Sequence, residues 1–249
     1  MNSNDKFIKP WDKNAHKRHQ QLKEGLDISF SKILVPAVIS LIRDLEGHEN
    51  FKTLDIGCGS GVFSQILSDN VNYVTAIDPS CESIQIARKF NENTKNISFI
   101  CTSIEEFSPK PFGLFDLVIA HMTFHTIKNL DITFRKITEI IKEKGYLVFS
   151  IPHPCFYFQQ KGNLKNYKFS YNTPDLYWIP FTISQDRTPL PAKTPYFHRK
   201  IEIYTSKLFK SGYVINKIIE PFPDQRMMSL YPSDRNWKSP HFIIFLCQK

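Results

Sequence analysis

Short apolar runs alternate with segments of helical periodicity between residues 52 and 151, and this alternation limits what the chain can fold into. Strands are predicted at 52–57, 73–78, 97–102, 115–120 and 145–151. Helices are predicted at 62–68, 81–90 and 130–142, with Gly145 at a helix cap or turn. The runs are almost continuously apolar, which is typical of parallel strands covered on both faces. The pattern therefore predicts a doubly wound α/β sheet with right-handed crossovers.

The regular alternation stops on both sides of this region. Residues 1–48 carry apolar side chains at helical spacing, so we expect a helical extension that starts or kinks at Pro36. Residues 152–203 are rich in Pro, Tyr and Phe and show few clear strands or helices. Beyond them we expect a helix at 205–211, a strand at 213–219, a loop at 221–240 and a last strand at 241–248. The last two strands should pair antiparallel at the sheet edge, which gives seven strands in a single domain over residues 1–249.

The composition is that of an ordinary globular protein, with 41% hydrophobic and 22% charged residues. No apolar run approaches the ~20 residues that cross a bilayer, and the N-terminus lacks the apolar stretch of a signal peptide, so we expect a cytoplasmic protein. The five cysteines form no CxxC pair, and we expect reduced, mostly buried thiols. We see no metal-ligand cluster and predict metal independence. The net charge of +8 comes from scattered residues and points only weakly to acidic ligands.

The segment LDIGCGSG, residues 54–61, places three glycines at the end of the first strand and directly before a helix. Glycine there lets a ligand approach the backbone closely. Asp78 ends the second strand, where a carboxylate can accept hydrogen bonds from both hydroxyls of a ribose. The loop departs from GxGxxG because Val62 stands at the last glycine position, and it lacks the GKS or GKT of a phosphate-binding loop. Asp55 would repel a diphosphate, so the loop suits a nucleoside with a cationic amino group and no phosphate.

LDIGCGSG followed by VTAIDPS resembles the class I S-adenosylmethionine-dependent methyltransferases, most of all the small-molecule branch of ubiquinone-biosynthesis type. The resemblance covers residues 27–151 and, loosely, the C-terminal strands, and it implies a Rossmann-like fold. It implies that the methionine part of the cofactor lies along Asp55, Gly57, Gly59 and Gly61. It also implies contacts of the ribose with Asp78, of the adenine with Pro79, Ser103 and Ile104, and of the methyl region with His121. The family usually has Asp where Ser103 stands.

The acceptor should bind beyond the carboxyl ends of the strands. The 152–203 insertion starts at that edge, and we expect it to cap the acceptor pocket with Phe156, Tyr157, Tyr171 and Trp178; a purely structural lobe is the alternative. The insertion is net basic, which is consistent with an acceptor carrying a carboxylate or phosphate, although ordinary solvated charges explain it equally well.

Methyl transfer requires aligned reactants, and a hydroxyl acceptor also requires a base, whereas an amine needs little base catalysis. The candidate bases are His121, His125, His153 and His198, of which His153, directly after the fifth strand, and His125 are favoured. The sequence distinguishes neither N- from O-methylation nor one oligomeric state from another.

Two other functions stay open. A nucleic-acid methyltransferase that acts on exocyclic amines would carry (Asp/Asn)-Pro-Pro-aromatic after the fourth strand, where this chain has Ala120-His121-Met122-Thr123-Phe124. Cys155 lies where cytosine-C5 enzymes on RNA place a nucleophile, yet their Pro-Cys pair after the fourth strand is missing. Nucleic acid is therefore a disfavoured partner. The second alternative is a non-catalytic module that keeps the cofactor fold, because fold alone does not establish chemistry.

Overall fold

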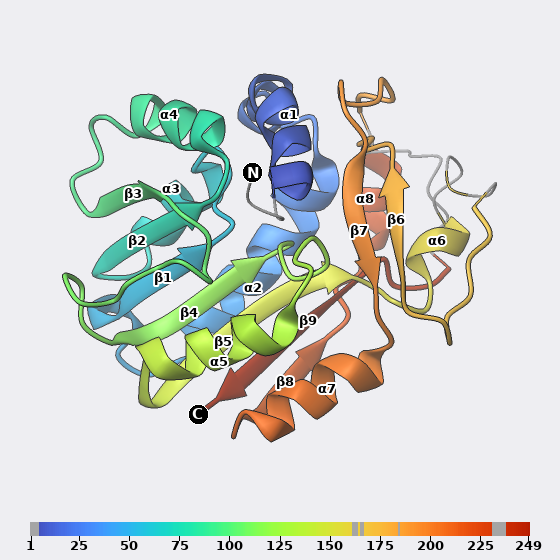
Figure 1. Cartoon of the computed structure of the whole chain (residues 1–249). Helices are drawn as coiled ribbons and strands as arrows, with labels where there is room; N and C mark the ends of the chain where they lie inside the picture. The colour runs from blue at the N-terminus through green and yellow to red at the C-terminus, as the bar shows by residue number, and fades with distance from the viewer. Residues whose placement is uncertain (1–4, 161–163, 165–166, 184, 231–237) are drawn as a thin grey trace.

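The computed structural model describes residues 5–160, 164, 167–183, 185–230 and 238–249. Its centre is a seven-stranded sheet with the order β3-β2-β1-β4-β5-β9-β8 (Figure 1). The strands are β1 (Lys52–Ile56), β2 (Tyr73–Asp78), β3 (Ile97–Cys101), β4 (Phe115–His121), β5 (Ile141–Pro152), β8 (Val214–Ile219) and β9 (Phe242–Gln248). The first five are parallel, and β9 runs antiparallel to both β5 and β8. The predicted doubly wound sheet with an antiparallel last strand is confirmed.

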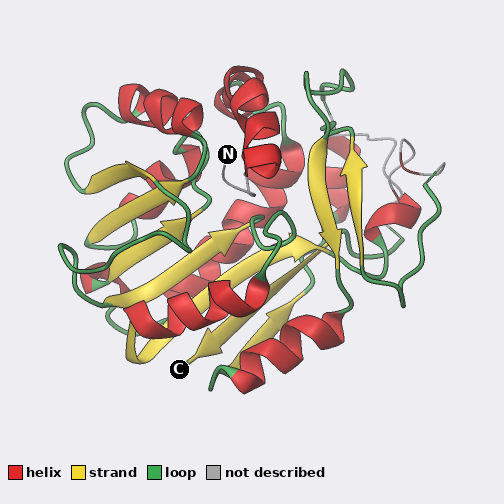
Figure 2. Cartoon of the chain, in the orientation of Figure 1, coloured by secondary structure: helices red, strands yellow, loops and turns green. Residues whose placement is uncertain are grey.

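Helices cover both faces of the sheet (Figure 2). On one face α2 (Val35–Arg43), α3 (Val62–Ser68) and α4 (Cys81–Phe90) bury Val38, Phe63 and Ile84 in one apolar cluster. On the other face α5 (Leu130–Ile140) and α7 (Ile201–Lys210) bury their apolar side chains in a second cluster. Each face of a central parallel strand is therefore covered, which explains why those strands are almost continuously apolar.

The N-terminal extension consists of α1 (Asp5–Lys23), a π-helical turn (Ser29–Leu34) and α2, with Pro36 in the first turn of α2. Proline is tolerated there because the first helical N–H groups have no partner within the helix. Helix α1 lies between α4 on one side and strand β7 (Thr194–His198) on the other (Figure 1). The N-terminal helix thus packs against two parts of the chain that are far from it in sequence.

The 152–203 segment is more regular than expected. It contains α6 (Tyr157–Gln160) and a separate two-stranded antiparallel sheet of β6 (Asp175–Ile179) and β7. An apolar cluster lies beside this sheet and consists of Tyr157, Phe158, Leu164, Ile179 and Tyr196. The helix predicted at 205–211 corresponds to α7, which begins earlier, at Ile201, and ends at Lys210. The predicted loop at 221–240 contains the short helix α8 (Gln225–Leu230), and its residues 231–237 lie outside the described part.

The prediction that Gly145 caps a helix or forms a turn is wrong. Helix α5 ends at Ile140 and β5 begins at Ile141, so Gly145 lies within a strand. A Cβ at this position would lie 2.8 Å from the carbonyl oxygen of Lys142. The glycine is needed because backbone approaches closely here, where the register between β4 and β5 shifts.

The expectation of five reduced cysteines is also wrong for one pair. Cys81, the first residue of α4, forms a disulfide with Cys101, the last residue of β3, while Cys58, Cys155 and Cys247 are free. The two are 20 residues apart in sequence, and β3 meets β2 in a register that pairs Cys101 with Asp78. Tertiary pairing of neighbouring strands brings them together, which spacing in the sequence does not reveal.

Within the described residues, no helix combines the length and the apolar character needed to span a membrane.

Candidate functional site

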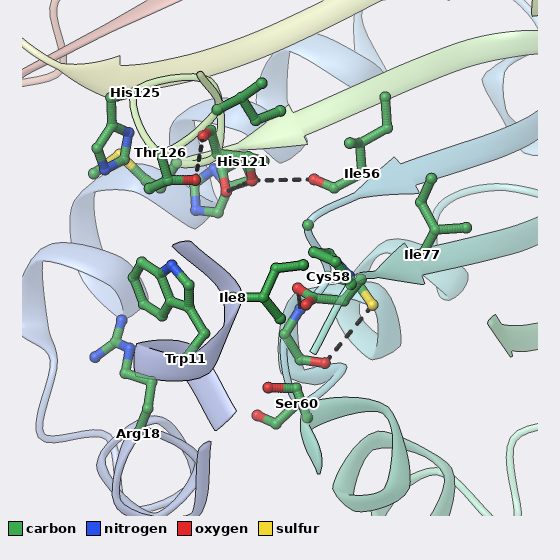
Figure 3. Close-up of a pocket in the computed structure, with 18 of the residues that line it drawn as sticks. Ile8, Trp11, Arg18, Ile56, Cys58, Ser60, Ile77, His121, His125 and Thr126 are labelled. Atoms are coloured by element: carbon green, nitrogen blue, oxygen red, sulfur yellow. Dashed lines mark hydrogen bonds between the residues drawn. The ribbon is translucent and has the colours of Figure 1, made fainter. Parts of the chain in front are cut away.

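A cavity of about 660 Å³ opens at the carboxyl ends of β1, β2 and β4, beneath α1. The glycine loop, the segments that follow β2, β3 and β4, and α1 itself border it. The insertion contributes Tyr157, Phe181, Thr182 and Ile183. Figure 3 shows Ile8 and Trp11 of α1 on one side of this space and Cys58 and Ser60 of the glycine loop on the other.

Hydrogen bonds hold the glycine loop against the end of β2. The amides of Gly57 and Cys58 donate to the carbonyl oxygen of Ile77 at 2.8 and 3.1 Å, and the Gly59 amide donates to Asp78 Oδ2 at 2.9 Å. Gly57 and Gly59 have φ of 73° and 53°, a region that favours glycine. The loop geometry thus places the ribose-binding candidate directly beside the loop backbone.

The two glycines are needed for different reasons. A Cβ on Gly57 would lie 2.5 Å from atoms of the Thr123 side chain, so this glycine permits close packing inside the protein. A Cβ on Gly59 would meet nothing within 4 Å, so this glycine faces open space. Gly61, the third predicted cofactor residue of the loop, does not border the cavity and instead starts α3. The loop therefore exposes Gly59 to a ligand and uses its neighbours for packing.

Two carboxylates lie beside the loop. Asp55 accepts a hydrogen bond from Ser64 Oγ at 2.6 Å, and burial raises its pKa to about 7 although that bond opposes the shift. Asp78 accepts from the amides of Ser80 at 2.8 Å and Gly59, and burial raises its pKa to about 6. A cationic group or a pair of hydroxyl donors entering the cavity would stabilise both ionised forms.

The segment after β3 borders the same end of the cavity. Ile104 is buried, and Pro79 and Ser103 also border the space, as the resemblance implies for the adenine. Ser103 Oγ accepts a hydrogen bond from the Glu106 amide at 3.3 Å, so the hydroxyl helps to shape a turn. Glu105 and Glu106 also border the cavity, and neither was predicted from the sequence.

The segment after β4 carries a buried histidine. His121 borders the cavity, and its Nδ1 lies 2.9 Å from Ser150 Oγ. Burial lowers the pKa of His121 to about 4, so the ring is neutral at pH 7. Next to it Thr123 Oγ1 donates to the carbonyl oxygen of Ile56 at 3.0 Å, which ties this segment to the end of β1.

The structure brings together only some of the predicted acceptor residues. His125 and Tyr157 border the cavity, whereas Phe156, Tyr171 and Trp178 do not. Trp178 stacks on Phe7 of α1 with ring centres 5.9 Å apart. The hydroxyl of Tyr171 accepts from the Ile201 amide at 3.3 Å. These two aromatic side chains pack the insertion against α1 and the start of α7.

His153 does not border the cavity either. Its ring is buried, Nε2 lies 2.7 Å from Glu220 Oε1, and Nδ1 accepts from the Cys155 amide at 3.2 Å. Nδ1 is therefore the unprotonated nitrogen, and Nε2–H donates to the carboxylate. Both ring nitrogens are used in joining the end of β5 to the chain after β8, so His153 is not positioned to act as a base in the cavity.

Helix α1 supplies side chains to the cavity that were not predicted from the sequence. Arg18 donates through Nη2 to Asp27 Oδ2 at 2.7 Å, and its guanidinium lies over the Phe181 ring, 4.8 Å from the ring centre. Phe7, Trp11 and Arg18 follow one another at helical spacing and all border the cavity. Figure 3 shows Trp11 and Arg18. This helical spacing was the sequence signal that could have identified the buried face of α1, although it did not reveal which surface that face covers.

The residues present fit a cationic nucleoside that carries an amino-acid chain. Asp78 can accept from a ribose, and Gly59 leaves open space beside the loop. Arg18 Nη1 and Ser60 Oγ are buried, and within the described part of the chain neither has a hydrogen-bond partner. Both border the cavity, where a carboxylate could accept from them.

Comparison with known proteins gives a family match. Residues 47–189 match the family model described as a methyltransferase domain. A malonyl-[acyl-carrier protein] O-methyltransferase from Acetivibrio thermocellus is 36% identical over 110 residues, which cover 43% of this chain and 38% of that protein. A ubiquinone biosynthesis O-methyltransferase from Bradyrhizobium diazoefficiens is 28% identical over 110 residues, covering 44% of this chain and 43% of that protein. The chain thus spans less than half the length of these two curated relatives.

The fold also has a solved counterpart. The S-adenosylmethionine dependent methyltransferase from Mesorhizobium loti superposes with a TM-score of 0.62 and 18% identity, over 86% of this chain and 96% of that one. At this identity the likeness establishes the fold.

Proposed function

We propose that this chain, which belongs to the methyltransferase-domain family, transfers the methyl group of S-adenosylmethionine to a small-molecule acceptor in the cavity under α1. The family match agrees with the resemblance that the glycine loop and Asp78 carry. The observation that carries the proposal is the hydrogen bond from the Gly59 amide to Asp78, at the edge of a cavity that α1 and the insertion also border. The same cavity therefore borders the residues proposed to bind the nucleoside and the aromatic side chains of α1 and the insertion.

The chain's own residues would bind and orient the cofactor, which supplies an activated methyl group on a sulfonium sulfur. Asp78 accepts the ribose hydroxyls, and Pro79 and Ile104 pack against the adenine. Arg18 is placed to bind the carboxylate of the amino-acid chain, and Asp55 stabilises positive charge near the glycine loop. Binding of the cofactor's ribose hydroxyls and positive charge should lower the pKa of Asp78 and Asp55 again, because each ionised carboxylate then has a partner.

The acceptor would lie in the compartment formed by α1, the insertion and the segment after β4. Trp11 and Phe181 meet edge to face with ring centres 6.5 Å apart, and both border the cavity. Aromatic walls exclude water and hold a flat or apolar group in line with the methyl group. His125 remains the candidate base for a hydroxyl or acid acceptor, because it borders the same space. The names of the two curated relatives, both O-methyltransferases, support an oxygen nucleophile.

The expected acidity of the acceptor stays a prediction. Among the described residues of the insertion, no basic side chain borders the cavity. Lys161 and Lys165 lie outside the described residues. In the described part of the chain, the lysine and arginine side chains at the cavity are Arg18 of α1 and Lys128, which precedes α5. An acidic acceptor would therefore meet Lys128 rather than the basic residues of the cap.

Calorimetry with S-adenosylhomocysteine tests the cofactor part of the proposal. The wild-type chain should bind one equivalent, and Asp78→Ala should weaken binding by about 1–3 kcal/mol through loss of a charged acceptor. Absence of binding by the folded wild-type protein would overturn the proposal. Transfer of a radiolabelled methyl group to a panel of carboxylates, phenols and amines would then identify the acceptor class.

A further inference from the structure

His121 and Ser150 face each other across two neighbouring strands. They are register partners on β4 and β5, and both side chains are buried. Ser150 Oγ lies 2.9 Å from His121 Nδ1, and it also accepts a hydrogen bond from the Met122 amide at 2.9 Å. Met122 has a φ of 54°, unusual for a residue other than glycine, so the backbone turns sharply at this point.

The three groups leave one consistent arrangement of protons. A serine hydroxyl has a single proton, and the Met122 amide can only donate. If Ser150 donates to His121 Nδ1, then every polar hydrogen at Ser150 and Met122 is paired, and the ring proton is on Nε2. The opposite tautomer would leave the serine hydroxyl proton without an acceptor among the described residues, and such buried unpaired groups are disfavoured. The burial that lowers the pKa of His121 keeps the ring neutral, so it carries only one proton.

The other ring nitrogen of His121 is Nε2. His121 Nε2 is buried and has no hydrogen-bond partner in the part of the chain that the structure describes. The ring cannot turn easily, because it stacks on Phe63 with centres 4.6 Å apart and meets Phe30 at 5.7 Å. The side chain is 9% exposed and borders the cavity. A donor held in this way is arranged for a ligand rather than for folding alone.

The groups around the His121 ring indicate which kind of ligand group it binds. Asp27 accepts hydrogen bonds from Arg18 Nη2 at 2.7 Å and from the Phe30 amide at 3.1 Å, and the Phe30 ring lies 5.7 Å from the His121 ring. This chain of contacts links Arg18 to His121 along the border of the cavity. Arg18 Nη1 is a second buried donor without a partner among the described residues. Two donors at one end match the two oxygens of a carboxylate.

We infer that Ser150 holds His121 in the Nε2–H tautomer and that this N–H, together with Arg18, binds the carboxylate of the cofactor's amino-acid chain. The inference rests on the proposed function. It makes His121 a ligand-binding residue and Ser150 a positioning residue that acts through it. It also explains why a polar pair lies at the otherwise apolar ends of two central strands.

Binding of two related compounds separates this inference from the proposed function. S-adenosylhomocysteine carries the carboxylate, whereas 5′-methylthioadenosine has the same nucleoside and sulfur but no amino-acid chain. His121→Leu should weaken S-adenosylhomocysteine about tenfold or more and leave 5′-methylthioadenosine within about twofold, because only one of them has the charged acceptor. His121→Gln, whose amide N–H reaches about as far as Nε2, should keep most of the affinity. Equal loss for both compounds would overturn the inference, whereas failure of the wild-type chain to bind either would overturn the proposed function.

Nuclear magnetic resonance tests the role of Ser150 directly. In protein labelled with ¹⁵N-histidine, long-range ¹H–¹⁵N spectra should show the His121 ring as a single Nε2–H tautomer, assigned by its disappearance in His121→Gln. Ser150→Ala should produce a mixture of tautomers and weaken S-adenosylhomocysteine, and Ser150→Thr, which keeps the hydroxyl, should restore both signals. An Nδ1–H tautomer in the wild type, or an unchanged spectrum in Ser150→Ala, would overturn the inference.

Discussion

The cavity has a proposed adenosine end, at the glycine loop and the ends of β2 and β3, and a proposed acceptor end, between α1 and the insertion. The two ends are built from different kinds of structure. At the adenosine end, backbone amides of a short loop bind the ends of adjacent parallel strands, as when Gly59 donates to Asp78 and Gly57 donates to Ile77. At the acceptor end, side chains from α1 and from the insertion meet, as when Trp11 contacts Phe181. The adenosine end depends on the close approach of backbone from neighbouring strands and loops. The acceptor end depends on how α1 and the insertion, which are far apart in sequence, pack together.

Polar contacts fix α1 between these two ends. On one side, Ser80, two residues after the ribose candidate Asp78, donates through Oγ to Asp12 Oδ1 at 2.7 Å. On the other side, the buried amide of Asn14 donates to the carbonyl oxygen of Ala192 at 2.9 Å and accepts from its N–H at 2.8 Å. Helix α1 therefore contacts the segment after β2 through Asp12 and the insertion through Asn14. Because different side chains make the two contacts, changes at the two ends should have separable effects.

The largest effect is expected from a methyl group added to the packed backbone of the loop. Gly57→Ala places a Cβ 2.5 Å from Thr123 at a φ of 73°. We expect the free energy of unfolding to fall by about 4 kcal/mol, since left-handed strain and overpacking add. Gly47→Ala is the matched control, because Gly47 has the same φ and nothing within 4 Å. Urea denaturation should show a loss of only about 1 kcal/mol for the control; equal losses would mean that close packing at Gly57 is unimportant.

The next effect concerns the disulfide beside the adenosine end. The Cys81–Cys101 bond closes a 20-residue separation between the start of α4 and the end of β3. The double variant Cys81→Ser/Cys101→Ser should lower the free energy of unfolding by about 3 kcal/mol, as expected for a loop of this length. A dithiol should destabilise the wild type by a similar amount and leave the double variant unchanged. If the dithiol affects both proteins alike, the bond does not stabilise this end.

A smaller effect is expected at the contact between α1 and the cap. Asn14→Ala removes two buried hydrogen bonds to Ala192 and should lower the free energy of unfolding by about 2 kcal/mol. The adenosine end should stay intact, so affinity for 5′-methylthioadenosine should change less than twofold in calorimetry. A large loss of nucleoside affinity in this variant would show that the two ends are not separable.

A further effect is a pH dependence located at the adenosine end. Burial raises the pKa of Asp55 to about 7 from its ordinary 3.8, so the folded chain holds a proton that the unfolded chain has released. This contribution to stability is fully present below about pH 4 and is lost as the pH rises to about 7. Asp55→Asn should flatten the unfolding free energy across that window, as measured by urea denaturation at several pH values.

The same ionisation should affect ligand binding in the opposite sense. A cationic amino group is bound by the ionised carboxylate, so affinity for S-adenosylhomocysteine should rise between pH 5.5 and 7.5 in the wild type. The rise should be smaller in Asp55→Asn. A wild-type affinity that falls over this range would contradict the assignment of Asp55.

Most of the fold and the adenosine end could be read from the sequence because both depend on neighbours along the chain. Continuous apolar runs identify central strands, and the strand–glycine–helix order places Asp55, Gly59 and Asp78 at one edge of the sheet. Two predictions, for Gly145 and for the cysteines, were wrong because they depend on tertiary contacts. Gly145 depends on the close approach of backbone around the start of β5, and the Cys81–Cys101 pair depends on the packing of α4 against β3; residue spacing does not reveal either contact.

The acceptor end was decided by the tertiary structure. The sequence shows that His153 follows β5, but only packing shows that Glu220 and the Cys155 amide use both of its ring nitrogens outside the cavity. Arg18 and Trp11 reach the cavity because α1 folds back between α4 and β7. Side-chain contacts between distant segments depend on the direction in which each helix lies, and periodicity along one helix indicates a buried face without naming what covers it.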